Sequence, residues 1–157
     1  MSFLPDKLLV SSPNGGGVLL VDGGVPARLS CVDGTGLALT PHGLLRGLQS
    51  ESDSTLAVID QRGYRRISLA EESLDIHDVL HTHRATFVAC TEFNGVIELD
   101  DAFTERRRWS FPGEPDSVHL NCLCLHRGRL LASMFGDFSE HRVTREKPRV
   151  GVKYAMC

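Results

Sequence analysis

Three stretches, Val18-Leu19-Leu20-Val21-Asp22, Leu56-Ala57-Val58-Ile59-Asp60 and Val96-Ile97-Glu98-Leu99-Asp100, decide the fold of this 157-residue chain. Each is a short apolar run that ends in an aspartate, as strands that lead into a turn commonly do. The closing aspartates are 38 and then 40 residues apart. A second element recurs at an offset of 43 residues, where Asp78-Val79-Leu80 matches Asn121-Cys122-Leu123. The chain therefore contains an internal repeat of about 40 residues.

Short apolar runs continue along most of the chain from Lys7 to Met134, each bounded by Gly, Pro, Asp, Asn or Ser. No stretch keeps the three- and four-residue apolar spacing of a helix over three turns. A repeat near 40 residues with about four short strands is typical of a β-propeller blade, whose two faces are buried only when blades stack. The sequence therefore predicts an all-β fold built from three to four four-stranded blades.

The repeat also predicts where the blades begin and end. The units are residues 8–38, 41–79 and 84–122, and a fourth unit starts at Arg127. Because propellers close with 4–8 blades of about 40–45 residues, we expect a partial β-propeller that does not close as a single chain. The repeat domain covers residues 1–140, and residues 141–157 form a basic, irregular tail. Two explanations stay open: a truncated gene product, or a half that closes its ring as a homodimer.

Composition narrows the class of function. The 17 basic and 20 acidic residues give a net charge of −3, which argues against a nucleic-acid-binding protein. No apolar run approaches the ~20 residues that span a membrane, and the first residues lack the basic and then apolar order of a signal peptide. The five cysteines are odd in number and follow no disulfide spacing. We expect a cytoplasmic protein without nucleic-acid or membrane partners.

Four short motifs occur in a fixed order: Asp33-Gly34-Thr35-Gly36-Leu37-Ala38, Asp75-Ile76-His77-Asp78, Trp109 and His119-Leu120-Asn121. Together they resemble the uncharacterised bacterial family called domain of unknown function 4915, over about residues 8–136. The resemblance implies a propeller of the six-bladed type with no assigned activity, and it supplies no catalytic residues. Cys122 stands where the family usually has Gly, and the family continues through further blades.

Propellers bind ligands at one mouth of the central channel, so the side chains just before the inner strands are the candidate site. The predicted ligand-binding residues are Asp75, His77, Asp78, Glu114, His119 and Asn121, and Asp33, Thr35 and Asp116 share their register. Asp78, His119 and Asn121 could hold a divalent cation such as Ca²⁺. Such a site resembles lactone-hydrolysing propellers, in which the ion would polarise a carbonyl and activate water. The alternative is structural, with Asp78 and Asn121 capping strand ends and bonding backbone between blades.

Three functions therefore remain open. The preferred one is a non-enzymatic module that binds a small molecule or a protein at the propeller mouth. The alternative is a metal-dependent, lactonase-like hydrolase or lyase with its site at the same mouth. The third is a non-functional remnant of a longer gene. Catalytic residues stay unassigned, because the sequence has no Gly-x-Ser-x-Gly motif and no cysteine-hydrolase signature.

Overall fold

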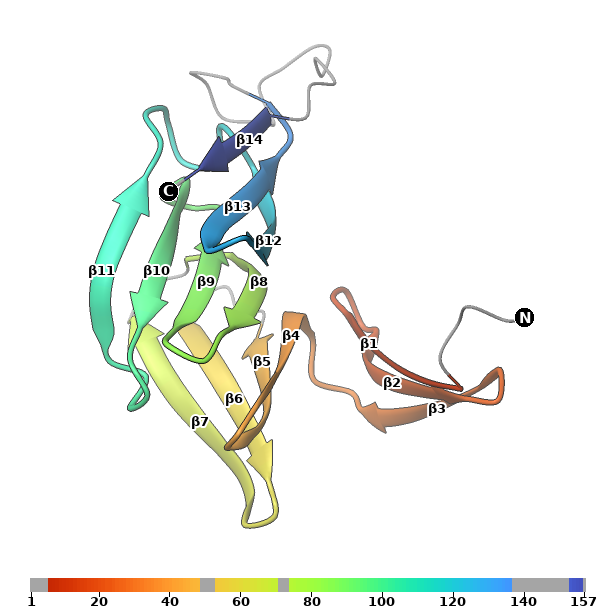
Figure 1. Ribbon diagram of the computed structural model, residues 1–157. Helices are drawn as coiled ribbons and strands as arrows, with labels where there is room; N and C mark the ends of the chain where they lie inside the picture. The colour runs from red at the N-terminus through yellow and green to blue at the C-terminus, as the bar shows by residue number, and fades with distance from the viewer. Residues whose placement is uncertain (1–5, 49–52, 71–73, 137–152, 157) are drawn as a thin grey trace.

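The structure is a computed structural model that describes residues 6–48, 53–70 and 74–136 and the backbone of 153–156. These residues form four antiparallel sheets, each of three or four strands that are neighbours in the sequence (Figure 1). No helix long and apolar enough to cross a membrane occurs among them. The all-β prediction is confirmed.

Each sheet is one blade, numbered here in chain order. Blade 1 holds β1 (Lys7–Ser12), β2 (Gly17–Asp22) and β3 (Val25–Ser30). Blade 2 holds β4 (Gly34–Thr40), β5 (Gly43–Leu48), β6 (Ser54–Asp60) and β7 (Gly63–Ala70). Blade 3 holds β8 (Ile76–His81), β9 (Thr86–Cys90), β10 (Gly95–Leu99) and β11 (Glu105–Ser110). Blade 4 holds β12 (Leu120–His126), β13 (Arg129–Met134) and β14 (Lys153–Met156).

The blades are arranged around their first strands, as in a propeller. β4 touches β8 where Thr35 donates its hydroxyl to the carbonyl of Ile76, and β8 touches β12 where Asp78 Oδ2 accepts the N–H of Leu123 at 2.7 Å. β4, β8 and β12 are therefore inner strands that lie side by side, and the sheets do not close into a ring (Figure 1). The prediction of a partial β-propeller is confirmed.

The predicted unit boundaries are displaced by one strand. The sequence units start at Pro41 and Arg84, whereas blades 2 and 3 start at Gly34 and Ile76. The inner strand β8 opens blade 3, because it pairs with β9 and not with β7. Apolar runs locate strands, but they do not show which neighbour each strand pairs with.

The register of the inner strands also differs from the sequence match. The first pairs are Gly34 with Leu48, Ile76 with Cys90 and Leu120 with Met134. Blades 3 and 4 are therefore offset by 44 residues, not by 43. Asn121 consequently corresponds to His77, whereas the sequence matched it to Asp78. The offset of 43 also matches His83-Arg84 to His126-Arg127 at the turns, and turn residues do not fix the register of the strands beside them.

Blade 1 lacks a strand that blades 2 and 3 have. The strands that end at the repeated aspartates are β2, β6 and β10, and the strands paired before them are β1, β5 and β9. β1 is therefore the counterpart of β5 and β9, which are second strands. Among the described residues, no strand occupies the inner position that β4 and β8 fill in their blades.

Two strands were missed by the sequence. β3 contains Pro26 and is almost wholly exposed, so it has no apolar run. β14 pairs with β13, with Tyr154 opposite Ser133, inside the tail that was predicted to be irregular. A strand of four residues needs only an open edge to pair with, and the local sequence does not show that edge. The remainder of that tail, residues 141–152 and Cys157, lies outside the described residues.

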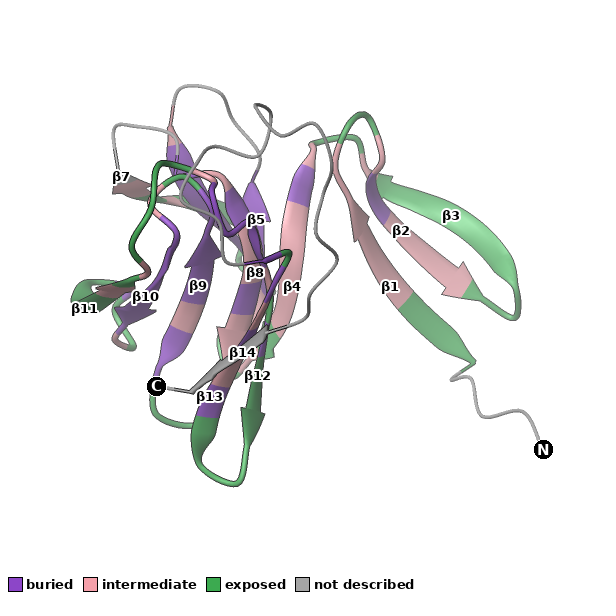
Figure 2. Ribbon diagram, turned by 90° about the horizontal axis from the view of Figure 1, so that it is seen from above, coloured by how far each residue is buried: buried purple, intermediate pink, exposed green. Residues whose placement is uncertain are grey.

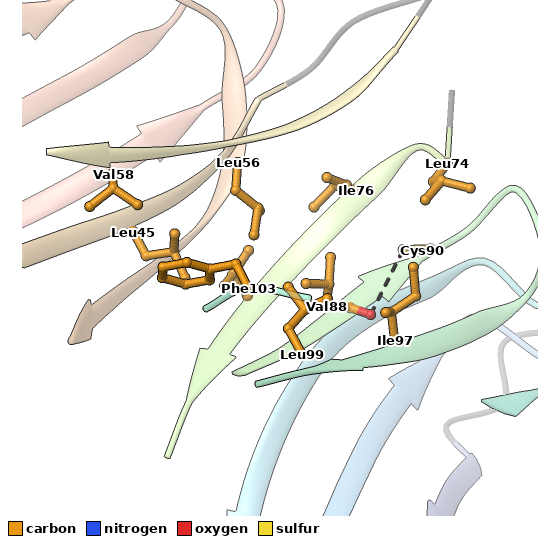
Figure 3. Close-up of a cluster of buried hydrophobic side chains, with 11 residues drawn as sticks. Leu45, Leu56, Val58, Leu74, Ile76, Val88, Cys90, Ile97, Leu99 and Phe103 are labelled. Atoms are coloured by element: carbon orange, nitrogen blue, oxygen red, sulfur yellow. Dashed lines mark hydrogen bonds between the residues drawn. The ribbon is translucent and has the colours of Figure 1, made fainter. Parts of the chain in front are cut away.

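The core lies between successive blades (Figure 2). Between blades 2 and 3, the side chains of β5 and β6 point toward those of β8, β9 and β10 (Figure 3), and the most completely buried include Leu45, Leu56, Val58, Val88, Ile97 and Leu99. Between blades 3 and 4 a second cluster includes Ala89, Val96, Leu120, Leu123 and Ala132. Val88 and Ala89 belong to opposite clusters because successive strand residues face opposite ways. Each buried leucine or valine contributes about 1.5–3 kcal/mol.

Blade 1 stands apart from the other three blades in both views (Figures 1 and 2). Its β1 edge is closest to β4, where Ser11 Oγ donates to the carbonyl of Gly34 at 2.9 Å. Val18 is buried, but Leu8, Val25 and Leu29 are 47 %, 68 % and 59 % exposed. Blade 1 therefore contributes little to the apolar core.

Candidate functional site

The candidate site lies where β8 and β12 begin, at one end of the inner strands. It consists of Asp75, His77, Asp116, His119 and Asn121, which we call the Asp–His cluster. Asp75, Asp116 and His119 all have a positive φ, between 47° and 55°. Asp and His adopt this left-handed conformation more readily than most residues with a side chain. The turned backbone places their side chains beside the first residues of the strands.

The first half of the cluster links blades 3 and 4. Asp75 Oδ2 is 3.3 Å from His77 Nε2 and also accepts a hydrogen bond from the Thr91 hydroxyl. The other ring nitrogen, His77 Nδ1, is 3.3 Å from Asn121 Oδ1, on the neighbouring blade. Asn121 Nδ2 in turn donates to the carbonyl of His119 at 3.3 Å, which fixes the orientation of the amide.

The partners of His77 determine its charge. Both are oxygen atoms, and each can accept a hydrogen bond from the ring nitrogen beside it, so the two contacts together favour the doubly protonated imidazolium form. Burial lowers the pKa of His77, but the hydrogen bond and charge of Asp75 and the contact with Asn121 outweigh it, so the pKa lies above 6.5. The hydrogen bond with His77 is the main cause that lowers the pKa of Asp75. Each partner of the pair therefore favours the charged form of the other.

The second half of the cluster repeats this pairing on blade 4. Asp116 Oδ1 is 2.5 Å from His119 Nδ1. The His119 ring meets the His77 ring edge to face, with 4.6 Å between centroids, and the Phe135 ring lies 5.4 Å away on another side. The His119 and Asp116 side chains are 11 % and 16 % exposed, against 21 % and 34 % for His77 and Asp75. The cluster is thus most open to solvent at Asp75.

This arrangement can recognise a polar molecule. The carboxylates of Asp75 and Asp116 accept hydrogen bonds, and an imidazole can donate a proton or accept one near neutral pH. Two carboxylates facing two imidazoles suit a ligand with several hydroxyl groups, which both donate and accept. The same groups could serve as general acid or base toward such a ligand.

Asp78 has the structural role that the alternative interpretation assigned to it. Its Oδ1 accepts the N–H of Val79 at 2.9 Å and its Oδ2 accepts the N–H of Leu123 at 2.7 Å. Burial raises the pKa of Asp78, although both backbone hydrogen bonds oppose that effect. The carboxylate therefore joins the inner strands of blades 3 and 4, and it is not part of the cluster.

Glu114 also stands outside the cluster, because its residue is exposed and its carbonyl accepts from Asn94 Nδ2 at 2.7 Å. Asn94 is buried; it donates to Ser117 Oγ at 2.9 Å and accepts from Val118 N at 3.2 Å. It thereby holds the loop that carries the second Asp–His pair. The sequence analysis missed this role, although the Asn94-Gly95 dipeptide is a recognisable turn signal.

The residues of blade 2 that correspond to the Asp–His cluster form hydrogen bonds with the backbone of neighbouring blades instead. The two oxygens of Asp33 each lie 2.8 Å from the N–H of Gly15, on blade 1. Thr35, which corresponds to His77 and Asn121, donates to the carbonyl of Ile76. The candidate site is therefore confined to the seam between blades 3 and 4.

The three residues predicted to hold a divalent cation do not fit one as arranged. Both oxygens of Asp78 bind backbone N–H groups, and His119 Nδ1 faces Asp116. Asn121 is oriented by His77 and by the carbonyl of His119. In the part of the chain that the structure describes, no three His, Cys, Asp or Glu side chains form a group that could hold a metal ion.

A separate surface hollow of about 830 Å³ lies at the turns of blade 2, at the far end of β4 from Gly34. Its walls are residues 40–43 and 60–65, from the two hairpin turns of that blade. None of the predicted site residues lines it. We therefore place the candidate site at the Asp–His cluster, where two blades contribute charged groups.

Comparisons with known proteins bear on the fold. No family model matches the chain, and no curated protein matches it. The chain is similar to the crystal structure of "a putative 6-phosphogluconolactonase" from Bacteroides fragilis NCTC 9343, with a TM-score of 0.55 and 16 % sequence identity. The match covers 87 % of this chain and 48 % of that one, so the chain spans about half the length of that protein. At this identity the similarity shows the propeller-like fold alone.

Proposed function

We propose that this chain is a binding module of a propeller-type protein, and that the Asp–His cluster takes up a small molecule rich in hydroxyl groups. The observation that carries the proposal is the meeting of two Asp–His pairs from successive blades, with 4.6 Å between the His77 and His119 ring centroids. Ion pairs inside a blade seam cost desolvation, and apolar side chains there would stabilise the fold as well. A ligand site at the mouth explains why they are kept.

The family resemblance and the structural similarity support this assignment. The motifs that resemble domain of unknown function 4915 include Asp75-Ile76-His77-Asp78 and His119-Leu120-Asn121, and four of the five cluster residues lie within them. The similar structure carries the name of an enzyme that acts on a sugar-acid lactone, a molecule rich in hydroxyl groups. We also propose that a homodimer completes the ring of blades, because both ends of the blade row are three-stranded sheets in the described residues.

Lactonase-like hydrolysis is the second candidate function, and the name of the similar structure is what favours it. Because Asp78 binds two backbone N–H groups, a version that uses this carboxylate as a metal ligand would require the same two oxygens to bind the metal as well. The arrangement supports general acid–base help from an imidazole more directly. His119, held by Asp116, would be the group that exchanges the proton.

Calorimetric titration of the full chain with D-gluconate and with 6-phosphogluconate tests the proposal. Hydrogen bonds to charged groups contribute roughly 1.5–3 kcal/mol, so we expect Asp75→Asn and Asp116→Asn each to weaken binding by about tenfold or more. The matched control is His83→Gln, at an exposed turn position where the ring Nε2 accepts a hydrogen bond from Arg84 Nε at 3.0 Å. It should bind as the unaltered chain does.

Two results would count against the binding module. If neither acid binds, or if both carboxylate variants bind as well as the control variant, the cluster is not a site for such molecules. A pH-stat assay with 6-phosphogluconolactone then separates the two candidate functions. Accelerated ring opening that is lost in Asp116→Asn and kept in His83→Gln would identify the enzyme, whereas binding without turnover would identify the module.

A further inference from the structure

A buried charge lies at the seam between blades 1 and 2. Arg46, on β5, is 2 % exposed, and its Nε donates to Ser11 Oγ at 3.1 Å. Its Nη2 is buried and has no hydrogen-bond partner. Burial lowers the pKa of Arg46, and the charge of Asp33 opposes that effect without reversing it. Among the described residues, however, Arg46 forms no ion pair. A guanidinium stays protonated in proteins, so this is an incompletely satisfied positive charge inside the fold.

The equivalent seams have aliphatic residues at this position. Arg46 lies two residues before Leu48, the partner of the first residue of β4. The corresponding positions are Val88 in blade 3 and Ala132 in blade 4, and both belong to apolar clusters. The fold therefore packs well without an arginine here, and burying an unpaired charge is costly. A group that compensates the charge is expected.

Gly34 shows that room is made for the guanidinium. A Cβ atom at Gly34 would lie 2.3 Å from the carbonyl oxygen of Gly47, and 3.0 Å from both Cζ and Nε of Arg46. Its counterparts in the other blades are Ile76 and Leu120, whose side chains are buried. An arginine on β5 and a glycine on β4 thus replace two apolar side chains together. The guanidinium is held beside the start of β4, facing blade 1.

Blade 1 offers a place for the missing group. In blades 2 and 3, the second strands β5 and β9 pair with the inner strands β4 and β8. Their counterpart β1 pairs with β2 on one edge, and no described strand pairs with its other edge. An unpaired strand edge accepts an extended peptide through backbone hydrogen bonds.

The seam between blades 3 and 4 shows what an inner strand supplies at this place. There Asp78 of the inner strand β8 reaches the N–H of Leu123 in the next blade, and Leu123 is paired with Ala132, the counterpart of Arg46. In blade 2 the residue paired with Arg46 is Leu37. Suppose that a strand is added at the inner position of blade 1. A carboxylate at the position equivalent to Asp78 would then lie beside Leu37, the residue that is paired with Arg46.

We propose that the inner edge of β1 binds an extended segment of a second polypeptide, antiparallel to β1, and that an acidic side chain of this segment pairs with Arg46. Backbone hydrogen bonds along β1 provide affinity, and the ion pair selects an acidic segment. The exposed apolar residues of blade 1 fit an interaction surface that a partner covers. This inference does not depend on the small-molecule site, which lies in a different seam.

Binding of a synthetic peptide tests the proposal. The probe is this chain's own inner strand β8 with one flanking residue at each end, Asp75-Ile76-His77-Asp78-Val79-Leu80-His81-Thr82, and the matched peptide has Asn in place of Asp78. Fluorescence anisotropy with the full chain should show about tenfold tighter binding of the aspartate peptide, as a charge-assisted pair provides. In Arg46→Met that preference should disappear, because the charge is gone and a side chain of similar length remains.

Hydrogen exchange locates the bound peptide. The amides of β1 should exchange more slowly in the complex, and those of β8 should be unchanged. The proposal is overturned if neither peptide binds, if Arg46→Met keeps the preference for aspartate, or if slower exchange appears in blades 3 and 4 only. Arg46→Lys serves as the second variant, because it keeps a charge without the planar fork and should retain part of the preference. Circular dichroism establishes that each variant is folded.

Discussion

The seam between blades 2 and 3 and the seam between blades 1 and 2 are formed by equivalent strands, but different interactions join them. Val88 of the first seam is fully buried among leucines and valines, as Figure 3 shows. Arg46, its counterpart in the second seam, contacts the hydroxyl of Ser11 and lies over Gly34. The first seam is joined by apolar burial, whereas the second has a charge and few apolar contacts.

This difference separates the part of the chain that stabilises the fold from the part that we propose binds a partner. A seam of aliphatic side chains is complete in itself, because its stability comes from the area that it removes from water. A seam with a buried cation and an open strand edge lacks a counter-charge for the cation and a paired strand for the edge. The Asp–His cluster is a third arrangement, in which both partners of each pair are present within the chain.

Replacing Val88 in the apolar seam by arginine should give the largest loss of stability. Val88→Arg would bury a cation among leucines without a partner, so we expect a loss of roughly 3–5 kcal/mol in the free energy of unfolding. Urea denaturation followed by circular dichroism measures it. A loss below about 1 kcal/mol would show that this seam is not closely packed. The matched control is Ile59→Arg, at a position of β6 that is 37 % exposed.

Asp78→Ala should give the next largest effect, because it removes the acceptor that joins β8 to β12. The N–H of Leu123 loses its partner, and a buried unsatisfied donor costs roughly 1–3 kcal/mol. Hydrogen exchange of the Leu123 amide should accelerate together with this loss. Asp78→Asn keeps one acceptor oxygen and should lose less. Equal stability of the alanine variant and the unaltered chain would contradict the structural role of Asp78.

The sequence was sufficient for the fold class because apolar alternation and turn residues report local structure directly. It identified β8 and β12 as inner strands, and it placed Asp75, His77, His119 and Asn121 near one mouth. It could not give the one-residue register of β12 against β8, which depends on which backbone groups pair.

Roles that depend on contacts between residues far apart in the sequence could also not be predicted from the sequence. Asp78 was grouped with the ligand residues because carboxylates suit both metals and backbone N–H groups, and only the position of Leu123 decides between them. Arg46 stands in the run Leu44-Leu45-Arg46-Gly47-Leu48, where nothing local distinguishes a buried arginine from an exposed one.

Arg46→Leu should change the free energy of unfolding much less than Val88→Arg does in the apolar seam. Replacing a buried charge by a hydrophobic side chain is often neutral or stabilising, so we expect a change within about 1 kcal/mol, or a gain. The same urea experiment measures it. A loss of roughly 3 kcal/mol or more would mean that a partner of Arg46 already satisfies its charge within the folded chain.

The smallest expected effect concerns pH. The folded-state pKa of His77 is raised, so its contribution to stability is fully present below 6.5 and is lost as pH rises through that folded-state value. The pKa of Asp75 is lowered, so its contribution is present above 3.8 and is lost as pH falls through the lower folded-state value. The difference in unfolding free energy between the unaltered chain and His77→Gln should therefore be largest between these limits and shrink above them. A difference that grows with rising pH would contradict the ion pair.

The central claim is that the His77 imidazolium joins Asp75 on blade 3 to Asn121 on blade 4 and so forms one site from two blades. Nitrogen NMR of the His77 ring across pH tests it most directly. We predict that both ring nitrogens carry hydrogen at pH values where an ordinary histidine, with a pKa of 6.5, is already losing one, and that Asp75→Asn lowers the midpoint. A His77 ring that titrates at or below 6.5, unchanged by Asp75→Asn, would contradict the account.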